Sequence, residues 1–428
     1  MEQKNNIITK CKYESEFSKC NFPIWEKDGL YCIFHSELIN EKKDKFEIEF
    51  KNILKTIENE PGKFNDINGF VFPETVKLEH IKFLSTIRIS NCKFFGDICL
   101  EGCEFNSEFR IIGNIIHGNV EIKWSKFDKG FIFNWNEVTG YFKFHINFVN
   151  AVTSFRVSQI KDYFIISFSS FIGEMEIIDM KVRKALYFYG IDFSRAARTR
   201  FRNIDLTNVY FSDSKLVDID FIGTTWKTQK NRIVIGDEIV LQAEEIPTHY
   251  PIKNIQNLKE KESIVESLYL QLCANYDKSR LFDISGKFYL SAMEMRRQSR
   301  GNWFRRNLFS WEAWYKYISL YGQSSKRAFW GIILILFLSS IIISFDPNII
   351  QHLDNTPISD FNFKDILFII KIFLKSVKYN LYCLIHPAEW TFQDKISLTA
   401  FVTACERIFV ILLGTFFLLA LRRRFRRS

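Results

Sequence analysis

The sequence predicts a mixed fold, in which a small N-terminal element and a β-solenoid precede an α-helical linker and an α-helical domain with two membrane spans. Two observations predict it. Apolar residues recur every eleven residues across 84–204, and apolar runs occupy 328–345 and 398–421. A short fixed period indicates stacked coils, and runs of this length can cross a bilayer. The expected domains are 1–60, 64–226, 227–325 and 326–428.

Three apolar columns define the repeat. They run in steps of eleven residues from Phe83 to Ile204, from Ile87 to Leu186, and from Ile89 to Phe188. The second column has one polar member, Thr153. Offsets of four, six and eleven residues fit short strands joined by turns and do not fit a helix. The pattern therefore predicts coils built from two eleven-residue units.

Glycine recurs at two places in the unit, where corners are expected. These are Gly96, Gly118, Gly140 and Gly173 at the second place, and Gly102, Gly113 and Gly190 at the eighth. The segment Phe94–Phe105 resembles the degenerate pentapeptide-repeat pattern, and the resemblance extends over 64–226. It implies a right-handed quadrilateral β-helix. Solenoids serve as scaffolds and binding surfaces far more often than as enzymes.

The composition narrows the class of protein. The chain has 428 residues, a net charge of +9 and 45 phenylalanines. No apolar signal segment follows the polar start at 1–10, and nine cysteines without a paired framework are expected to stay reduced inside a cell. Motifs for phosphate binding, metalloprotease chemistry or serine hydrolysis do not occur, and His117, His145 and His249 stand alone. We therefore do not expect an enzyme.

The first forty residues contain a candidate metal site. Cys11, Cys20, Cys32 and His35 follow the pattern Cys-x8-Cys-x11-Cys-x2-His. Three thiolates and an imidazole suit tetrahedral Zn²⁺, and the last two residues form a chelating pair on one turn. Four protein ligands leave no position for water, so the predicted zinc-ribbon-like site is structural. The alternative is four small residues without a shared role.

Three segments outside the solenoid are expected to be helical. The charged segment 37–58 predicts an amphipathic helix that covers the open edge of the first coil. The segment 260–300 predicts one or two cytoplasmic helices. In 303–321, aromatic residues alternate with arginine and lysine, which suits a helix in the inner headgroup layer. The alternative for this last segment is an ordinary core helix.

Basic residues flank both predicted spans. Eight lysines and arginines lie between 296 and 327, and five arginines follow Leu421. By the positive-inside rule, both termini are expected in the cytoplasm and 346–397 on the outer side. The solenoid would then also be cytoplasmic.

Ionisable residues occur within the apolar segments. They are Lys364, Lys371, Lys375 and Lys378 on one helical face of 361–385, and Glu406 and Arg407 in the second span. Charged groups at membrane depth indicate a pore or polar pathway, which a simple anchor does not need. Two spans per chain enclose a pore only as a symmetric ring, most simply a tetramer. The lysine segment is either a re-entrant helix or an outer-surface helix that snorkels its lysines.

The segments Asn275–Arg297 and Glu406–Arg423 resemble the juxtamembrane helix and terminal span of bacterial pentapeptide-repeat membrane proteins with a two-span, channel-like tail. The resemblance implies a pore domain over the last third of the chain. No Thr-x-Gly-Tyr-Gly filter occurs between Ile385 and Ser397. We therefore do not expect this chain to select potassium through a ring of backbone carbonyls.

Basic residues gather at the end of the repeat region. They are Lys181, Arg183, Arg195, Arg198, Arg200 and Arg202. The last three alternate along an expected strand and so share an outward face. Guanidinium groups at strand spacing suit the phosphates of a nucleic acid. Attraction to anionic lipid, or solvation alone, is the alternative.

The succession of a cysteine-containing N-terminus, a β-solenoid and a channel-like tail resembles the membrane effectors of bacterial anti-phage defence, in particular the DNA-gated channels of Hailong systems. The resemblance implies a homotetrameric channel in the bacterial inner membrane. It also implies closure by a short single-stranded DNA that a partner nucleotidyltransferase makes. The expected function is a gated pore; the alternative is a membrane-anchored interaction scaffold without conduction.

Overall fold

A computed structural model describes most of the chain. It covers residues 10–15, 19–59, 64–242, 258–300, 303–344, 370, 372–378, 381 and 398–427. The chain forms two compact units, Met1–Met295 and Arg296–Ser428. The first unit contains the solenoid with helices at its ends, and the described part of the second is helical.

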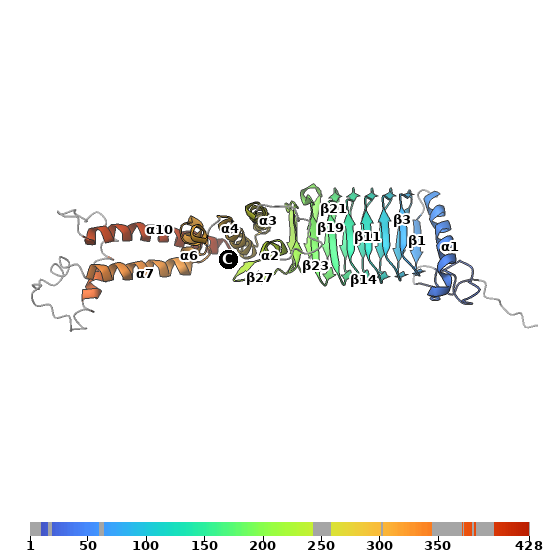
Figure 1. The fold of residues 1–428 in the computed structure, drawn as a ribbon, viewed down its shortest axis with the longest axis horizontal. Helices are drawn as coiled ribbons and strands as arrows, with labels where there is room; N and C mark the ends of the chain where they lie inside the picture. Colours follow the sequence, from blue (N-terminus) through green and yellow to red (C-terminus); the bar gives the residue numbers. More distant parts are fainter. Residues whose placement is uncertain are drawn as a thin grey trace, which may run out of the picture. The chain divides into compact units, whose positions relative to one another are not determined.

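The repeat region folds into a parallel β-solenoid of about seven turns, which confirms the predicted fold (Figure 1). Its strands form four sheets, here called faces 1 to 4, and each strand pairs with the strand one coil away. Phe64 pairs with Thr86, a step of 22 residues, so each coil consists of two eleven-residue units as predicted.

The four faces differ in strand length and strand number. Face 1 contains β1 (Phe64–Asn68), β5 (Thr86–Ser90), β9 (Phe109–Ile112), β13 (Phe131–Asn134), β17 (Thr153–Arg156), β21 (Glu174–Ile178), β24 (Arg198–Arg202) and β26 (Ile219–Ile222). Face 2 contains β2 (Val71–Phe72), β6 (Lys93–Phe94), β10 (Ile115–Ile116), β14 (Glu137–Val138), β18 (Gln159–Ile160) and β22 (Lys181–Val182). Face 3 contains β3 (Val76–Glu79), β7 (Ile98–Glu101), β11 (Val120–Lys123), β15 (Phe142–His145), β19 (Tyr163–Ser167), β23 (Ala185–Tyr189) and β25 (Val209–Tyr210). Face 4 contains β4 (Lys82–Phe83), β8 (Glu104–Phe105), β12 (Lys126–Phe127), β16 (Phe148–Val149) and β20 (Ser170–Phe171).

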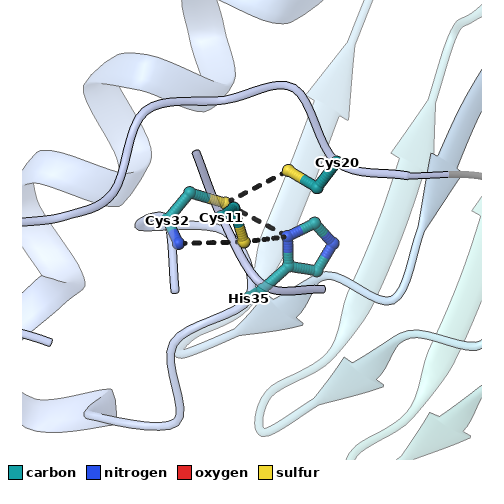
Figure 2. Close-up of side chains that lie close together, drawn as sticks. All are labelled: Cys11, Cys20, Cys32 and His35. Carbon is teal, nitrogen blue, oxygen red and sulfur yellow. Dashed lines mark hydrogen bonds between the residues drawn. The ribbon is translucent and has the colours of Figure 1, made fainter. Parts of the chain in front are cut away.

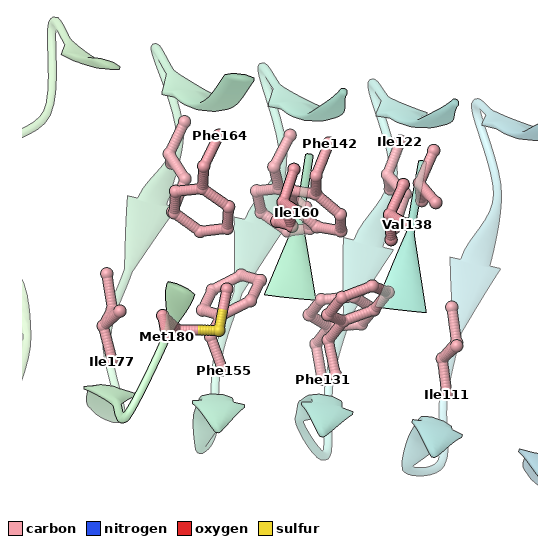
Figure 3. Packing of buried hydrophobic residues seen from close by; sticks show 14 of the residues in the cluster. Ile111, Ile122, Phe131, Val138, Phe142, Phe155, Ile160, Phe164, Ile177 and Met180 are labelled. Atoms are coloured by element: carbon pink, nitrogen blue, oxygen red, sulfur yellow. The ribbon is translucent and has the colours of Figure 1, made fainter. Parts of the chain in front are cut away.

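The three predicted apolar columns fill the solenoid interior (Figure 3). Every member is buried except Val182, which is half-buried. Rings from facing strands meet in the middle: the Phe155 ring centroid lies 5.5 Å from that of Phe142 and 5.2 Å from that of Phe164. The eleven-residue spacing thus builds one continuous core of stacked side chains.

A fourth buried column repeats at the same spacing and is largely polar. It contains Cys92, Cys103, Asn114, Ser125, Asn136, Asn147, Ser158 and Ser169. Each asparagine bonds to the coil before it. Asn136 Oδ1 accepts the Asn114 amide at 3.0 Å, and Asn136 Nδ2 donates to the Ile111 carbonyl at 2.9 Å. These buried side-chain bonds tie successive coils together.

Residues with a left-handed backbone recur at the same spacing, and eight of them directly precede a member of the polar column. These eight corner residues are Asn91, Gly102, Gly113, Trp124, Trp135, Ile146, Val157 and Phe168. Gly69, His80, Asp179 and Gly190 occupy the equivalent corners before and after the column. The eighth-place glycines therefore occupy positive-φ corners, as glycine favours. Gly96 meets a different need, because a Cβ there would lie 2.3 Å from the Thr75 backbone nitrogen in the preceding coil.

The regular step changes near the C-terminal end of the solenoid. A 3-10 helix, η1 (Phe193–Arg195), follows β23. Glu174 then pairs with Arg198, a step of 24 residues, and Thr199 pairs with Ile219, a step of 20 residues. The two deviations cancel, so Phe193 and Ile204 remain in the interior where the period of eleven predicts them.

Helices cover both ends of the solenoid. At the N-terminal end, α1 (Ile39–Asn59) is the expected amphipathic helix, and its Phe46 and Phe50 pack on Phe72. At the other end lie β27 (Thr228–Gln229), β28 (Arg232–Ile233), α2 (Gly236–Gln242), α3 (Leu258–Lys278) and α4 (Phe282–Gln298). Tyr276 of α3 stacks on Phe221 and accepts a hydrogen bond from Trp226.

The second unit consists of two short helices and two long ones in its described part. They are α5 (Trp303–Asn307), α6 (Trp311–Ser319), α7 (Ser325–Ser344) and α10 (Leu398–Arg427). The long helices α7 and α10 pack side by side (Figure 1). Within 361–385, the described residues 370, 372–378 and 381 are helical.

Candidate metal centre and membrane helices

The structure brings the four predicted metal ligands together. The donor atoms of Cys11, Cys20, Cys32 and His35 all lie within 4.8 Å of one another, and the side chains point toward one centre (Figure 2). Cys20 Sγ is 3.7 Å from Cys32 Sγ, and Cys11 Sγ is 3.6 Å from His35 Nδ1. Two sulfurs about 2.3 Å from a tetrahedral ion stand about 3.7 Å apart. The spacing suits a metal ion.

Short local structures position the ligands. Cys32 and His35 lie on one turn, in which the His35 amide donates to the Cys32 carbonyl at 3.1 Å. The Cys32 backbone amide donates a hydrogen bond to Cys11 Sγ at 3.2 Å, which positions Cys11. Three ligands are buried and Cys20 is half-buried, so four protein donors close the centre to solvent.

The first coil of the solenoid orients the imidazole. His35 Nε2 lies 2.9 Å from the Asn68 carbonyl of β1, and the Tyr13 ring stacks on the imidazole with a centroid separation of 3.9 Å. A proton on Nε2 leaves the Nδ1 lone pair for a metal. A metal bound here would therefore stabilise the contact between the N-terminal element and the solenoid.

The thiols do not titrate alike. A hydrogen bond from Cys32 lowers the pKa of Cys20 to about 4, while the same pair and burial raise the pKa of Cys32. Burial also raises the pKa of Cys11. The apo cluster thus carries one thiolate readily, and further deprotonation requires a bound cation.

Lys42 supplies a positive charge beside this centre. Its side chain is fully buried and donates to the carbonyls of Ile33 and Ser36, at 3.2 and 2.6 Å. Burial lowers its pKa to about 8. Three thiolates and a divalent ion have a net charge of −1, which the Lys42 ammonium offsets. The sequence analysis missed Lys42, Asn68 and Tyr13, because nothing in their spacing marks them as neighbours of the cysteines.

The predicted basic residues are distributed over several faces. Arg198, Arg200 and Arg202 lie on β24 of face 1 and alternate with the buried Thr199 and Phe201, as predicted. Lys181 lies on β22 of face 2, Arg183 follows that strand, and Arg195 belongs to η1. The six residues are therefore spread over faces 1 and 2 and the η1 turn.

Acidic residues on the neighbouring coils pair with two of the three arginines on β24. Arg198 Nη2 lies 3.0 Å from Asp220 Oδ2, and Arg200 Nη1 lies 2.5 Å from Glu176 Oε1. Arg156 also pairs with Glu176. Arg202 is exposed and forms no ion pair with a described residue. Of the three arginines on β24, Arg202 is thus the one whose charge no described acidic residue compensates.

Two helices are long and apolar enough to cross a membrane, Ser325–Ser344 and Phe401–Arg422. Within the chain, only 22% and 17% of their 18-residue apolar windows are buried, whereas the core helix of a soluble domain is mostly buried. The 303–321 segment also exposes large aromatic side chains, including Phe309 at 80%, between α5 and α6, and Trp311 at 83%, at the start of α6. Such exposure suits lipid contact and disfavours the ordinary core helix.

Polar residues are buried where α7 meets α10. Glu406 and Thr403 of α10 and Ser339 and Ser340 of α7 are each at most 5% exposed. Glu406 lies within hydrogen-bonding reach of Ser339. The neighbouring Arg407 is half-buried. Glu406 of the second span thus faces the first span of the same chain.

The predicted lysine face is described only in part. Lys375 is half-buried and Lys378 is exposed, on the helical segment 372–378. Lys364 and Lys371 lie outside the described residues.

Comparison with known proteins adds no relative. No protein-family model matches the chain, no curated protein is similar to it, and no solved structure matches its fold.

Proposed function

We propose that the chain is one subunit of an oligomeric membrane pore. The binding of a ligand to the solenoid would gate this pore. The buried polar groups between α7 and α10 carry the proposal, because ionisable groups at membrane depth are costly and accompany polar pathways. A symmetric ring of chains, a homotetramer in this proposal, would enclose the pore. The flanking charges support a cytoplasmic location for both termini and the solenoid, and the membrane would be a bacterial inner membrane.

The proposed metal is a structural Zn²⁺ held by Cys11, Cys20, Cys32 and His35. The donor set suits zinc better than harder cations, which prefer oxygen ligands. Four protein ligands leave no open position, so the ion would stabilise the fold and perform no chemistry.

The proposed gating ligand is a short single-stranded DNA made by a partner nucleotidyltransferase, in line with the resemblance to Hailong effectors, and the system would serve anti-phage defence. Exposed Arg202 supports an anionic ligand. Phosphates would compete with Asp220 and Glu176 for Arg198 and Arg200. Binding of labelled oligonucleotides should weaken steeply with salt, and the Arg202→Ala variant should lower the salt slope by about one.

A conductance measurement tests the pore. Full-length protein in planar bilayers should give discrete current steps, and Glu406→Gln should change their amplitude or ion selectivity. The matched control is Glu104→Gln, an exposed acid on β8 of the solenoid. Silent bilayers that contain inserted protein would contradict the proposal.

The second candidate function is a membrane-anchored scaffold without conduction. One observation favours it: Glu406 lies against Ser339 of its own chain, an arrangement that can serve to pair two helices. Under this function Glu406→Gln would weaken the helix pair, and bilayers would stay silent for every variant.

A further inference from the structure

The first coil of the solenoid leaves one sheet edge open. Its strands β1 to β4 are edge strands, and natural proteins usually cover such edges. The Asn68 carbonyl of β1 lies 2.9 Å from His35 Nε2, and the Val71 amide of β2 donates to the Phe34 carbonyl at 2.8 Å. Strand β4 lies against α1. Among the described residues, strand β3 has a neighbouring strand only on its β7 side.

The backbone of β3 is hydrogen-bonded on one side only. The amides of Val76 and His80 donate to carbonyls of the next coil, each at 2.8 Å. Peptide groups alternate in direction along a strand. The amides and carbonyls of Lys77 and Glu79 therefore point away from β7, and no backbone among the described residues pairs with them.

A groove runs along this open edge. It has a volume of about 370 Å³ and lies between one face of α1 and residues 72–79. Its floor is apolar, with the buried side chains of Phe46, Phe50, Phe72 and Leu78. Three lysines and three glutamates line it, and four of these six form the pairs Lys43–Glu74 and Lys51–Glu47. The groove thus offers apolar contact and unpaired backbone groups, with little net charge.

We propose that β3 and α1 together bind an extended peptide of a partner protein, which adds to face 3 as a further strand. Amides and carbonyls at strand spacing are matched by another extended backbone. Side chains of a strand alternate, so every second residue would enter the groove toward Phe50 and Phe72. The partner segment is therefore neutral, with apolar residues at alternate positions. This proposal is independent of any pore.

The probe is a synthetic peptide with the chain's own sequence Gly118–Trp124, in which Val120 and Ile122 alternate with polar residues and which already pairs within face 3. Hydrogen exchange is measured on the full-length protein in detergent. The Lys77 and Glu79 amides should exchange fast in the free protein and at least tenfold slower with the peptide. Two N-methylated peptides are compared, one methylated at Val120 and Ile122 and the other at Glu121 and Lys123. One of the two should no longer protect the Lys77 and Glu79 amides, and the other should still protect them.

A proline variant tests the same edge on the protein. Lys77→Pro removes an amide that no described residue uses, so the fold should survive while the peptide affinity falls at least tenfold. Lys77→Ala is the control and should bind normally. The proposal is overturned if the Lys77 and Glu79 amides are already protected in the free protein, or if both methylated peptides still protect them. Protection that grows with protein concentration would instead identify a second copy of the chain as the occupant.

Discussion

Ile146 and Val157 hold backbone conformations that β-branched residues rarely adopt. Their φ angles are 53° and 50°, and 44% and 45% of their surfaces are exposed. The left-handed region costs a residue with a Cβ about 1–2 kcal/mol, and asparagine tolerates it better. Their exposed side chains gain too little from burial to offset this cost. The stacked coils on either side hold the corner in place.

Replacing these residues with asparagine should therefore stabilise the solenoid. We expect Ile146→Asn and Val157→Asn each to raise the free energy of unfolding by about 1 kcal/mol, measured by denaturant unfolding. The control is Ile115→Asn, which changes an equally exposed residue in β10 with ordinary strand geometry. Ile115→Asn should be neutral or destabilising. Equal effects at all three positions would show that removal of exposed apolar surface, not backbone strain, decides the outcome.

The metal ligands give a second prediction at the residue scale. Cys32→Ser and His35→Ala should each lose about one bound zinc per chain, measured by metal analysis of purified protein, and should lower the melting temperature. Cys99→Ser is the matched control, since Cys99 is half-buried on β7 and outside the cluster. Full metal content in both ligand variants would exclude the site.

The hydrogen bonds of the polar column stabilise the contact between successive coils. Asn136→Leu would leave the Asn114 amide and the Ile111 carbonyl without their buried partner. We expect a loss of about 2–4 kcal/mol in the free energy of unfolding. Asn150→Leu is the control, because Asn150 bonds to Asp128 at the half-buried surface of face 4. If Asn136→Leu and Asn150→Leu lower the free energy of unfolding equally, water replaces the hydrogen bonds that the Asn136 side chain makes.

Glu176 makes the last coils sensitive to acid. Burial alone would raise its pKa, but hydrogen bonds from Arg156 and Arg200 outweigh burial and lower the pKa below its usual 4.5. A carboxylate with a lowered folded pKa stabilises the protein above its unfolded pKa, and the stabilisation is lost as pH falls through the folded value. The melting temperature should therefore drop below about pH 4.5. Glu176→Gln should flatten this part of the pH profile, and Glu104→Gln should not.

Periodicity made the core predictable from sequence, and chemistry made the metal ligands predictable. Phe133 and Phe155 fall on an apolar column, so their burial follows from counting. Asn136 lies at the same spacing and could have been found by the same count applied to polar residues. The left-handed corners at Trp135 and Val157 could not have been predicted, because tryptophan and valine rarely adopt a left-handed backbone. The Arg200–Glu176 pair depends on the 24-residue step at η1. No local sequence pattern predicts this step.

The charges that flank the two candidate spans predict the topology of the whole molecule. A fluorescent-protein fusion after Ser428 should fluoresce in the cytoplasm, because five arginines follow Leu421. An alkaline phosphatase inserted in the 346–397 segment should be active on the outer side. The reverse pattern would place the solenoid outside the cell and would remove a cytoplasmic DNA ligand from consideration.

The N-terminal element lies on the coil that the ribosome makes first. Asn68 and Val71 of that coil form hydrogen bonds with His35 and Phe34, so the N-terminal element covers β1 and β2 of the first coil. We expect each newly synthesised coil to pair with the coil before it, so that assembly follows the direction of translation. Zinc depletion during synthesis should then cause more misfolding than chelation of the completed protein, because a metal at the proposed site would stabilise the first coil before later coils pair with it.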